Sequence, residues 1–386
     1  MLIPRAIVAV IGVGALGWRP HSALSALLLA VAAGVDVAFG ARVAPALAVA
    51  VPLVAFLTAA LSLAALVERS GLAERTAAQL AMRARGSSLA LYAAVCALCA
   101  GLTAAVSLDG AVVLMVPLVL VLARRHAAPL APLLFGVIAV ANGASIAVPQ
   151  GNPTNLVLID RLGISAGAFA AHMLGPGLLA AALCAIVVAL TERRALAVAY
   201  RPTRAERTPF SASERHAALS LAAAALVAWT APLLALAPWW PFAAAVAVAL
   251  GTRRERLRLI IPWRVAVQIA GLLIVIGALG MRMPARIAPG LGGLLIIAMG
   301  IGAVSALANN LPLSGVAGAL LAAGPSAYAA SIGLAVGSLA TPQGSVATLI
   351  ATKLAGPDAP PMPRRWFAPL AGTAVALATL LLWATL

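Results

Sequence analysis

The sequence predicts an all-α polytopic membrane protein made of two inverted-topology repeats, each with about five spans, a re-entrant hairpin and a broken helix. Composition predicts the class, because 63% of the 386 residues are apolar and only 9% are charged, whereas soluble chains contain about 25% charged residues. A Pro-Gln-Gly motif that occurs twice predicts the repeat. These observations exclude a secreted domain, a cytosolic enzyme and a nucleic-acid binder.

Apolar blocks follow one another in two sets of six. They cover residues 3–18, 22–37, 44–66, 88–123, 131–163 and 173–191, and then 216–236, 238–250, 264–281, 290–323, 327–355 and 366–385. The interval 192–215 is the only long charged stretch, so we interpret it as a cytoplasmic linker. The first repeat is then residues 1–191 and the second is residues 216–386.

Two blocks in corresponding places, 88–123 and 290–323, are too long for one span and are broken in the middle. Each could be two spans or one re-entrant hairpin, but each arm is shorter than the ~20 residues that a full span needs. We therefore predict two hairpins. Five spans remain in each half, and an odd number makes the second half enter the membrane from the opposite side.

The basic residues predict the orientation. The chain has 26 Lys and Arg residues. With the linker inside the cell, all but Arg5, Arg42, Arg161, Arg282 and Arg286 fall on the cytoplasmic side, as the positive-inside rule requires. Both termini are then expected to face outward. The same arginines explain the net charge of +16 as contacts with lipid headgroups.

The repeat is visible in the residues themselves. Residues 145–163 align without gaps on 338–356, and both segments carry Pro-Gln-Gly, at 149–151 and 342–344. Pro and Gly unwind a helix and free backbone groups that lipid cannot satisfy. Such breaks persist where they line a cavity, and a matching pair in two halves indicates a transporter's binding site. We predict broken helices over 131–163 and 327–355.

Four unwound segments, 107–110, 149–155, 308–312 and 341–345, are expected to meet near the midplane of the membrane. Their amides, hydroxyls and one carboxylate suit a polar solute or a cation. The predicted substrate- or ion-binding residues are Ser107, Asp109, Gly110, Gln150, Gly151, Asn152, Thr154, Asn155, Asn309, Asn310, Gln343, Gly344, Ser345 and Thr348. The alternative is that these residues cap broken helices and join neighbouring ones.

Asp109 is the sharpest single signal, because an acid within the membrane costs about 2.5–3.5 kcal/mol and usually marks an ion or proton path. We predict that it couples transport to protons, and the alternative is a helix cap. Cys96 and Cys99 are interpreted as small apolar filling rather than as a thiophilic site. No metal site, cofactor or phosphate-binding loop is expected, so an ATP-driven pump within this chain is not supported.

Several motifs resemble the ArsB-type arsenite permeases of the ion transporter superfamily over nearly the whole chain. They are Ala-Asn-Asn-x-Pro at 308–312, Thr-Pro-x-Gly-Ser-x-Ala-Thr-Leu at 341–349, Pro-Trp at 262–263 and the hairpin segment 104–125. The resemblance implies a substrate site between hairpin tips and unwound spans, and alternating access of an elevator or related type. The chain departs from the family at Leu108, where members often carry Asn.

The resemblance implies proton-coupled efflux of arsenite or antimonite across the cytoplasmic (inner) membrane of the cell, without enzymatic activity. The expected partners are the lipid bilayer and a small-molecule or ion substrate; a cytosolic ATPase subunit and a homodimer are left open, and nucleic acid is excluded. The second hypothesis is a sodium- or proton-coupled carboxylate or other anion transporter of the same superfamily, ranked lower because the Ser-Asn-Thr signature of those symporters is absent. Sodium/proton exchange ranks third. A non-transporting membrane scaffold has no use for four matched helix breaks.

Overall fold

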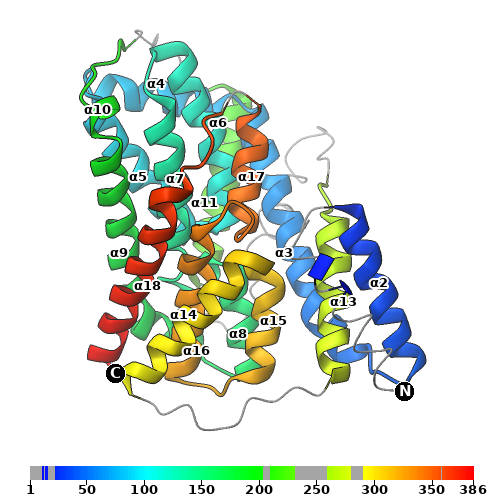
Figure 1. Ribbon diagram of the computed structural model, residues 1–386. Helices are drawn as coiled ribbons and strands as arrows, with labels where there is room; N and C mark the ends of the chain where they lie inside the picture. The colour runs from blue at the N-terminus through cyan, green and yellow to red at the C-terminus, as the bar shows by residue number, and fades with distance from the viewer. Residues whose placement is uncertain are drawn as a thin grey trace.

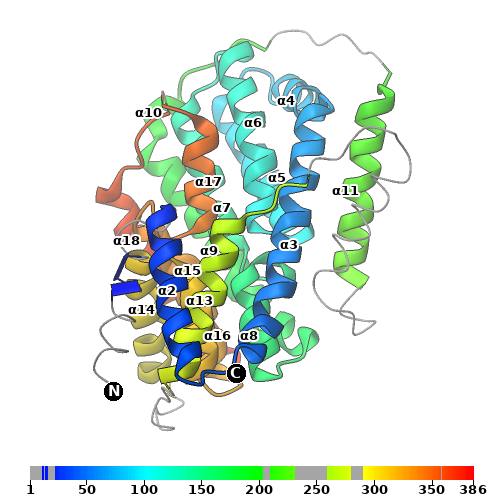
Figure 2. The same ribbon diagram turned by 90° about the vertical axis from the view of Figure 1, so that its right-hand side faces the viewer.

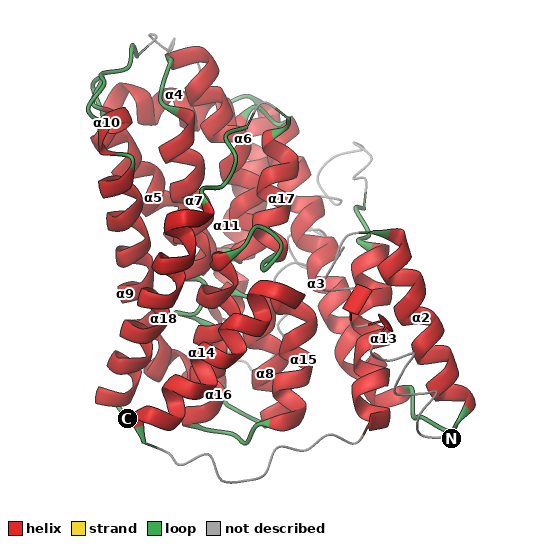
Figure 3. Ribbon diagram, in the orientation of Figure 1, coloured by secondary structure: helices red, strands yellow, loops and turns green. Residues whose placement is uncertain are grey.

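A computed structural model describes residues 11–12, 14–15, 22–202, 209–230, 259–279, 290–357 and 359–386. Every regular element in these ranges is a helix, which confirms the predicted all-α class (Figure 1, Figure 3). The predicted block 238–250 and most of 3–18 lie outside the described residues.

The helices follow the predicted blocks closely. Those of the first half are α2 (Ala23–Ala38), α3 (Ala44–Arg69), α4 (Leu72–Arg83), α5 (Ser88–Ala105), α6 (Leu108–His126), α7 (Leu130–Ala144), η1 (Pro149–Gly151), α8 (Pro153–Leu162) and α9 (Ala166–Thr191). The linker contains α10 (Arg193–Leu196). The second half contains α11 (Ala212–Thr230), α13 (Trp263–Leu279), α14 (Leu291–Ala308), α15 (Asn310–Leu320), α16 (Pro325–Val336), η2 (Gly337–Ala340), α17 (Val346–Ala355) and α18 (Arg364–Ala384).

Each predicted hairpin is a pair of helices joined by a very short turn. Val106 and Ser107 join α5 to α6, and Asn309 alone joins α14 to α15. In Figures 1 and 2, α5 and α6 lie toward the end of the molecule that carries α4, whereas α14 and α15 lie toward the end where the C-terminus is found. Among the described helices, α5, α9 and α18 are long and apolar enough to cross a membrane. The inverted repeat and the re-entry of the hairpins stay predictions.

The unwound segments at the hairpin tips are shorter than the sequence predicts. Asp109 and Gly110 already belong to the first turn of α6, and Asn310 begins α15. The reason is capping: Ser107 Oγ accepts a hydrogen bond from the backbone of Gly110, and Asn309 Oδ1 accepts one from Leu311. Because each cap satisfies an N–H that has no partner within its helix, the helix starts directly after it.

Two broken helices lie where the repeated motif predicts them. One runs α7–η1–α8 and the other α16–η2–α17, and each has a serine just after its first helix, Ser145 directly after α7 and Ser338 within η2. Ser145 Oγ donates to the backbone oxygen of Asn142 over 2.8 Å, and Ser338 Oγ donates to that of Ala335 over 2.7 Å. These contacts occupy matching positions of the alignment, so the two breaks share local structure as well as sequence.

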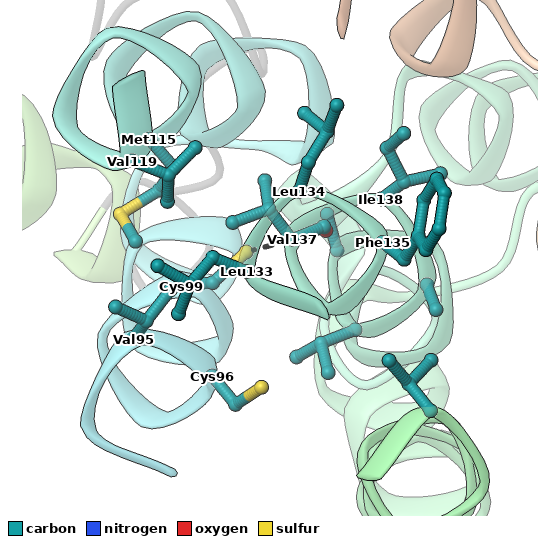
Figure 4. Close-up of a cluster of buried hydrophobic side chains, with 14 of the residues drawn as sticks. Val95, Cys96, Cys99, Met115, Val119, Leu133, Leu134, Phe135, Val137 and Ile138 are labelled. Atoms are coloured by element: carbon teal, nitrogen blue, oxygen red, sulfur yellow. Dashed lines mark hydrogen bonds between the residues drawn. The ribbon is translucent and has the colours of Figure 1, made fainter. Parts of the chain in front are cut away.

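Apolar packing fixes the first hairpin against the broken helix beside it (Figure 4). Val95 and Cys99 of α5 and Met115 of α6 meet Leu133 and Val137 of α7 in one buried cluster. The Cys99 thiol donates a long hydrogen bond of 3.5 Å to the backbone oxygen of Val137. Cys96 belongs to the same cluster, so both thiols pack as small apolar side chains here.

The linker ends four residues earlier than the sequence predicts, because α11 begins at Ala212 rather than at 216. Ser211 and Glu214 form a capping box: Ser211 Oγ accepts from the backbone of Glu214, and Glu214 Oε2 accepts from that of Ser211. Arg75 of α4 also donates to both carboxylate oxygens of Glu214, over 2.8 and 3.1 Å. The start of the second half is thereby tied to the first.

Candidate functional site

The tip of the first hairpin presents a buried carboxylate. Asp109 is 2% exposed and lies in the first turn of α6, where the helix dipole favours negative charge. Its Oδ1 atom has no hydrogen-bond partner among the described residues. Ser107 and Gly110 are occupied with each other in the cap. Of the three predicted site residues at this tip, only Asp109 therefore offers an unused side-chain oxygen.

The tip of the second hairpin is bound to the break in the second helix. Asn309 Nδ2 donates to the backbone oxygen of Gln343 over 3.0 Å, and the backbone N–H of Asn310 donates to the oxygen of Gly344 over 2.8 Å. Thr341 Oγ1 also donates to the backbone oxygen of Ala306. These bonds leave the side-chain oxygen of Asn310 buried without a partner in the described part of the chain.

The first broken helix is held open by its own asparagines. Asn155 Nδ2 donates to the backbone oxygens of Ser145 and Val148, over 2.8 and 3.1 Å. Asn152 caps α8 by accepting from the backbone of Thr154, and its amide donates to Ser145 Oγ. The capping interpretation is thus correct for part of each side chain. The Asn155 oxygen and the Thr154 hydroxyl nevertheless stay unpaired and buried within the described residues.

The first hairpin is also bound to the break of its own half, but here the side chain belongs to the break and the backbone oxygen to the hairpin. Gln150 Nε2 donates to the backbone oxygen of Ala104, near the end of α5, over 3.1 Å. Its Oε1 atom is buried and has no partner in the described ranges. Each hairpin tip is therefore fastened to the broken helix of its own half.

Glycine makes the breaks this tight. A Cβ atom on Gly151 would lie 2.5 Å from the backbone oxygen of Ser145, and one on Gly344 would collide even more closely with that of Ser338. The two positions correspond in the repeat alignment. Because real Cβ contacts are never so short, any other residue would force the backbone apart, and we attribute the conserved geometry of the two halves to this requirement.

One cavity brings residues from all four segments together. It is lined by Leu108, Asp109, Asn152, Pro153, Asn310, Leu311, Ser345, Val346 and Ala347. Its volume is about 10 Å³, which is about the room that one water molecule needs. The structure therefore brings Asp109, Asn152, Asn310 and Ser345 to a single place between the two hairpin tips and the two breaks. The apolar lining residues were not predicted, because nothing in an apolar run distinguishes a lining residue from a lipid-facing one.

Many of the predicted site residues have a buried oxygen atom without a partner among the described residues, and Asp109, Asn310 and Ser345 among them line this cavity. Seven of the predicted site residues carry one in the described structure: Asp109, Gln150, Thr154, Asn155, Asn310, Ser345 and Thr348. Leaving such a group unpaired costs roughly 1–3 kcal/mol each, so the three that line the cavity are expected to be satisfied by something that binds there. Gln343, by contrast, contributes its backbone oxygen. Asn142, also with an unpaired oxygen, was missed, although it is an isolated amide in an apolar run.

No Lys or Arg lines the cavity. The seven oxygens are four acceptor-only atoms and three hydroxyls, and a set of this kind suits a cation, a proton or a solute rich in donors.

Comparison with known proteins gives one result that covers most of the chain. The sequence of residues 6–336 matches the CitMHS family, which is described as a citrate transporter. No curated protein matches the chain.

Proposed function

Because the chain belongs to the CitMHS family of citrate transporters, we propose that it is a secondary transporter that carries a carboxylate such as citrate across the cytoplasmic membrane together with a cation. The family is a transporter family, so the chain is a membrane transporter and not an enzyme. The resemblance to arsenite permeases is confirmed only at the level of their common superfamily.

The observation that supports cation coupling is the composition of the cavity. A carboxylate substrate is an anion, and Asp109 beside it is an acid, yet no basic side chain lines the site. Asp109, Asn310 and Ser345, which line the site, each carry a buried oxygen without a partner in the described structure. Cations bound by these oxygens would neutralise the substrate. A site that is complete only when cation and substrate are both bound would couple the transport of one to the transport of the other. Sodium and the proton are the two candidates.

The size of the cavity supports alternating access. A space of about 10 Å³ cannot hold a citrate molecule. Loading therefore requires the hairpin tips to separate from the breaks, and the bonds at Asn309, Asn310 and Gln150 are the ones that would open. Closure around a substrate by movement of packed elements is a common transport step.

Efflux of arsenite or antimonite is the second candidate. It is favoured by the same lack of basic side chains, since a small neutral polyhydroxy solute needs only donors and acceptors. Asn152, Asn310 and Ser345 supply both.

Uptake into proteoliposomes separates the two candidates. The purified protein is reconstituted, and accumulation of labelled citrate and succinate is measured with an imposed sodium gradient, with an imposed pH gradient, and with neither; protein-free liposomes are the control. We expect citrate to accumulate only under a cation gradient. In parallel, the protein is expressed in an arsenite-sensitive bacterium. A gain in tolerance to arsenite or antimonite, without accumulation of either carboxylate under any gradient, would replace this proposal with the second candidate.

A further inference from the structure

Arg161 lies on a seam that leads away from the cavity. The seam is formed by α8 and α15, which pack against each other. It begins at the cavity, where Pro153 of α8 and Leu311 of α15 are both lining residues. Arg161 is eight residues further along α8, or about 12 Å at the rise of an α-helix. Gly318 is at a similar distance along α15.

The two residues are in direct contact across the seam. A Cβ atom on Gly318 would lie 2.9 Å from Cδ and 3.2 Å from Cβ of Arg161. The absent side chain of Gly318 therefore makes the space in which the stem of Arg161 lies along the hairpin arm. Arg161 is half-buried there, and its Nε atom is buried without a hydrogen-bond partner among the described residues.

Two neighbours account for part of this charge: Asp160 attracts the guanidinium electrostatically, and Arg161 stands in the last turn of α8, where the helix dipole favours a cation. Asp160 is exposed and one residue away on the helix, and the buried Nε atom of Arg161 accordingly has no hydrogen-bond partner among the described residues. A half-buried guanidinium with an unpaired N–H in an apolar protein is costly, and such a group usually serves a ligand.

The second repeat indicates that the fold itself does not require the charge. Arg161 corresponds to Leu354 at the alignment offset that relates Pro149 to Pro342. Leu354 packs against the apolar cluster that contains Val67, Val113 and Leu114. The matching position of the other repeat is thus filled by leucine, so the repeat can form this helix without a charge there.

We propose that Arg161 is a substrate-capture residue, which pairs with a carboxylate of the transported anion as it passes along the α8–α15 seam between the cavity and the end of the molecule that carries the C-terminus. The inference rests on the proposed function, since it needs an anionic substrate. A guanidinium is suited to the role because it offers several donors in a fixed plane to a carboxylate. Gly318 is the positioning residue that gives it room.

The test is a set of variants in proteoliposomes with labelled citrate: Arg161→Leu, Arg161→Lys, Gly318→Ala and the Arg161→Leu/Gly318→Ala double variant. The matched control is Lys353→Leu, which removes an exposed basic residue from α17 of the other repeat. Size-exclusion chromatography and thermal unfolding in detergent establish that each variant is folded. Arg161→Gln takes the place of Arg161→Leu if the leucine variant does not fold.

We expect Arg161→Leu to raise the KM for citrate about tenfold or more with Vmax within about twofold, which is the pattern for lost binding. Arg161→Lys keeps most of the affinity, and Lys353→Leu changes neither constant. Gly318→Ala raises KM when Arg161 is present and adds nothing to Arg161→Leu, because the two residues act as one unit.

Two results would overturn the inference. An unchanged KM in Arg161→Leu together with a lower Vmax and lower thermal stability would mean that the arginine binds a lipid phosphate. Additive effects of Arg161→Leu and Gly318→Ala on KM would show that the glycine and the arginine act independently. Failure of the proposed function is distinct from both, since it is measured on the unaltered protein, which would then accumulate no carboxylate.

Discussion

The side-chain amide of Asn309 donates a hydrogen bond to the backbone oxygen of Gln343, and so fastens the tip of the second hairpin to the break in the helix behind it. The side-chain oxygen of Asn309 caps α15 by accepting a hydrogen bond from the backbone of Leu311. One residue thus both starts a helix and closes the site. Ser107 caps α6 at the first tip, and no bond from its side chain to a broken helix is present in the described structure.

This difference predicts unequal effects of two alanine variants. Ser107→Ala loses one cap and should destabilise by about 1 kcal/mol. Asn309→Ala loses a cap and the bond to Gln343, and should destabilise by about 2–3 kcal/mol and reduce citrate uptake at least tenfold. Thermal unfolding in detergent and initial rates in proteoliposomes measure both. Equal effects of the two variants would show that the bond to Gln343 contributes little.

Asp109 is predicted to be the group that couples transport to protons. Asp109→Asn keeps the shape of the side chain and removes the charge, so the protein should fold and insert normally but lose uptake driven by a pH gradient. The matched control is Glu192→Gln, at a partly exposed carboxylate of the linker. Undiminished pH-driven uptake in Asp109→Asn would mean that this carboxylate only stabilises the first turn of α6 and does not couple transport to protons.

The breaks in the two helices should not tolerate a single added methyl group. Gly151→Ala and Gly344→Ala each place a Cβ atom against a backbone oxygen, and overpacking of this kind costs roughly 1–3 kcal/mol or more. We expect lower thermal stability and lost transport in both. Gly300→Ala is the control, because a Cβ atom there meets nothing within 4 Å. A tolerated Gly344→Ala would mean that this break widens freely.

The Arg75–Glu214 ion pair predicts a pH dependence of stability. Arg75 holds the pKa of Glu214 at about 2, below its ordinary value of 4.5. The folded state therefore favours the charged carboxylate, and the stabilisation is complete above pH ~4.5 and is lost as the pH falls toward ~2. Glu214→Gln should unfold at a lower temperature than the unaltered protein at pH 7. The difference between the two unfolding temperatures should become smaller on acidification below pH 4.5. A gap that does not change with pH would contradict the ion-pair origin.

The orientation in the membrane is predicted by the basic residues alone. A cysteine at Ser213 should react with an impermeant reagent only after the cells are opened, whereas one at Arg42 should react in intact cells. The native cysteines give a low background, because Cys96, Cys99 and Cys184 are all buried. Reaction of the Ser213 cysteine from outside would contradict the five-plus-five inverted topology.

The amino-acid sequence by itself determined the helical class, the hairpin breaks near Ser107 and Asn309 and the two Pro-Gln-Gly breaks. These features are local: composition, a proline or glycine within an apolar run, and a capping residue act through bonds within a few positions of the chain. The repeat could be recognised in the sequence for the same reason, since Gly151 and Gly344 must each fit against a backbone oxygen six residues earlier.

Only the tertiary structure decided which of the predicted polar residues share one cavity, which oxygens stay unpaired, and that Arg161 lies against Gly318. Gln150 reaches Ala104 across 46 positions, and Arg161 meets Gly318 across an even longer separation. Such contacts depend on how each helix is rotated about its axis, and one residue of shift turns a side chain by about 100°. Apolar sequence is nearly the same on every face of these helices, so it does not fix that rotation; the close packing of one helix against another does.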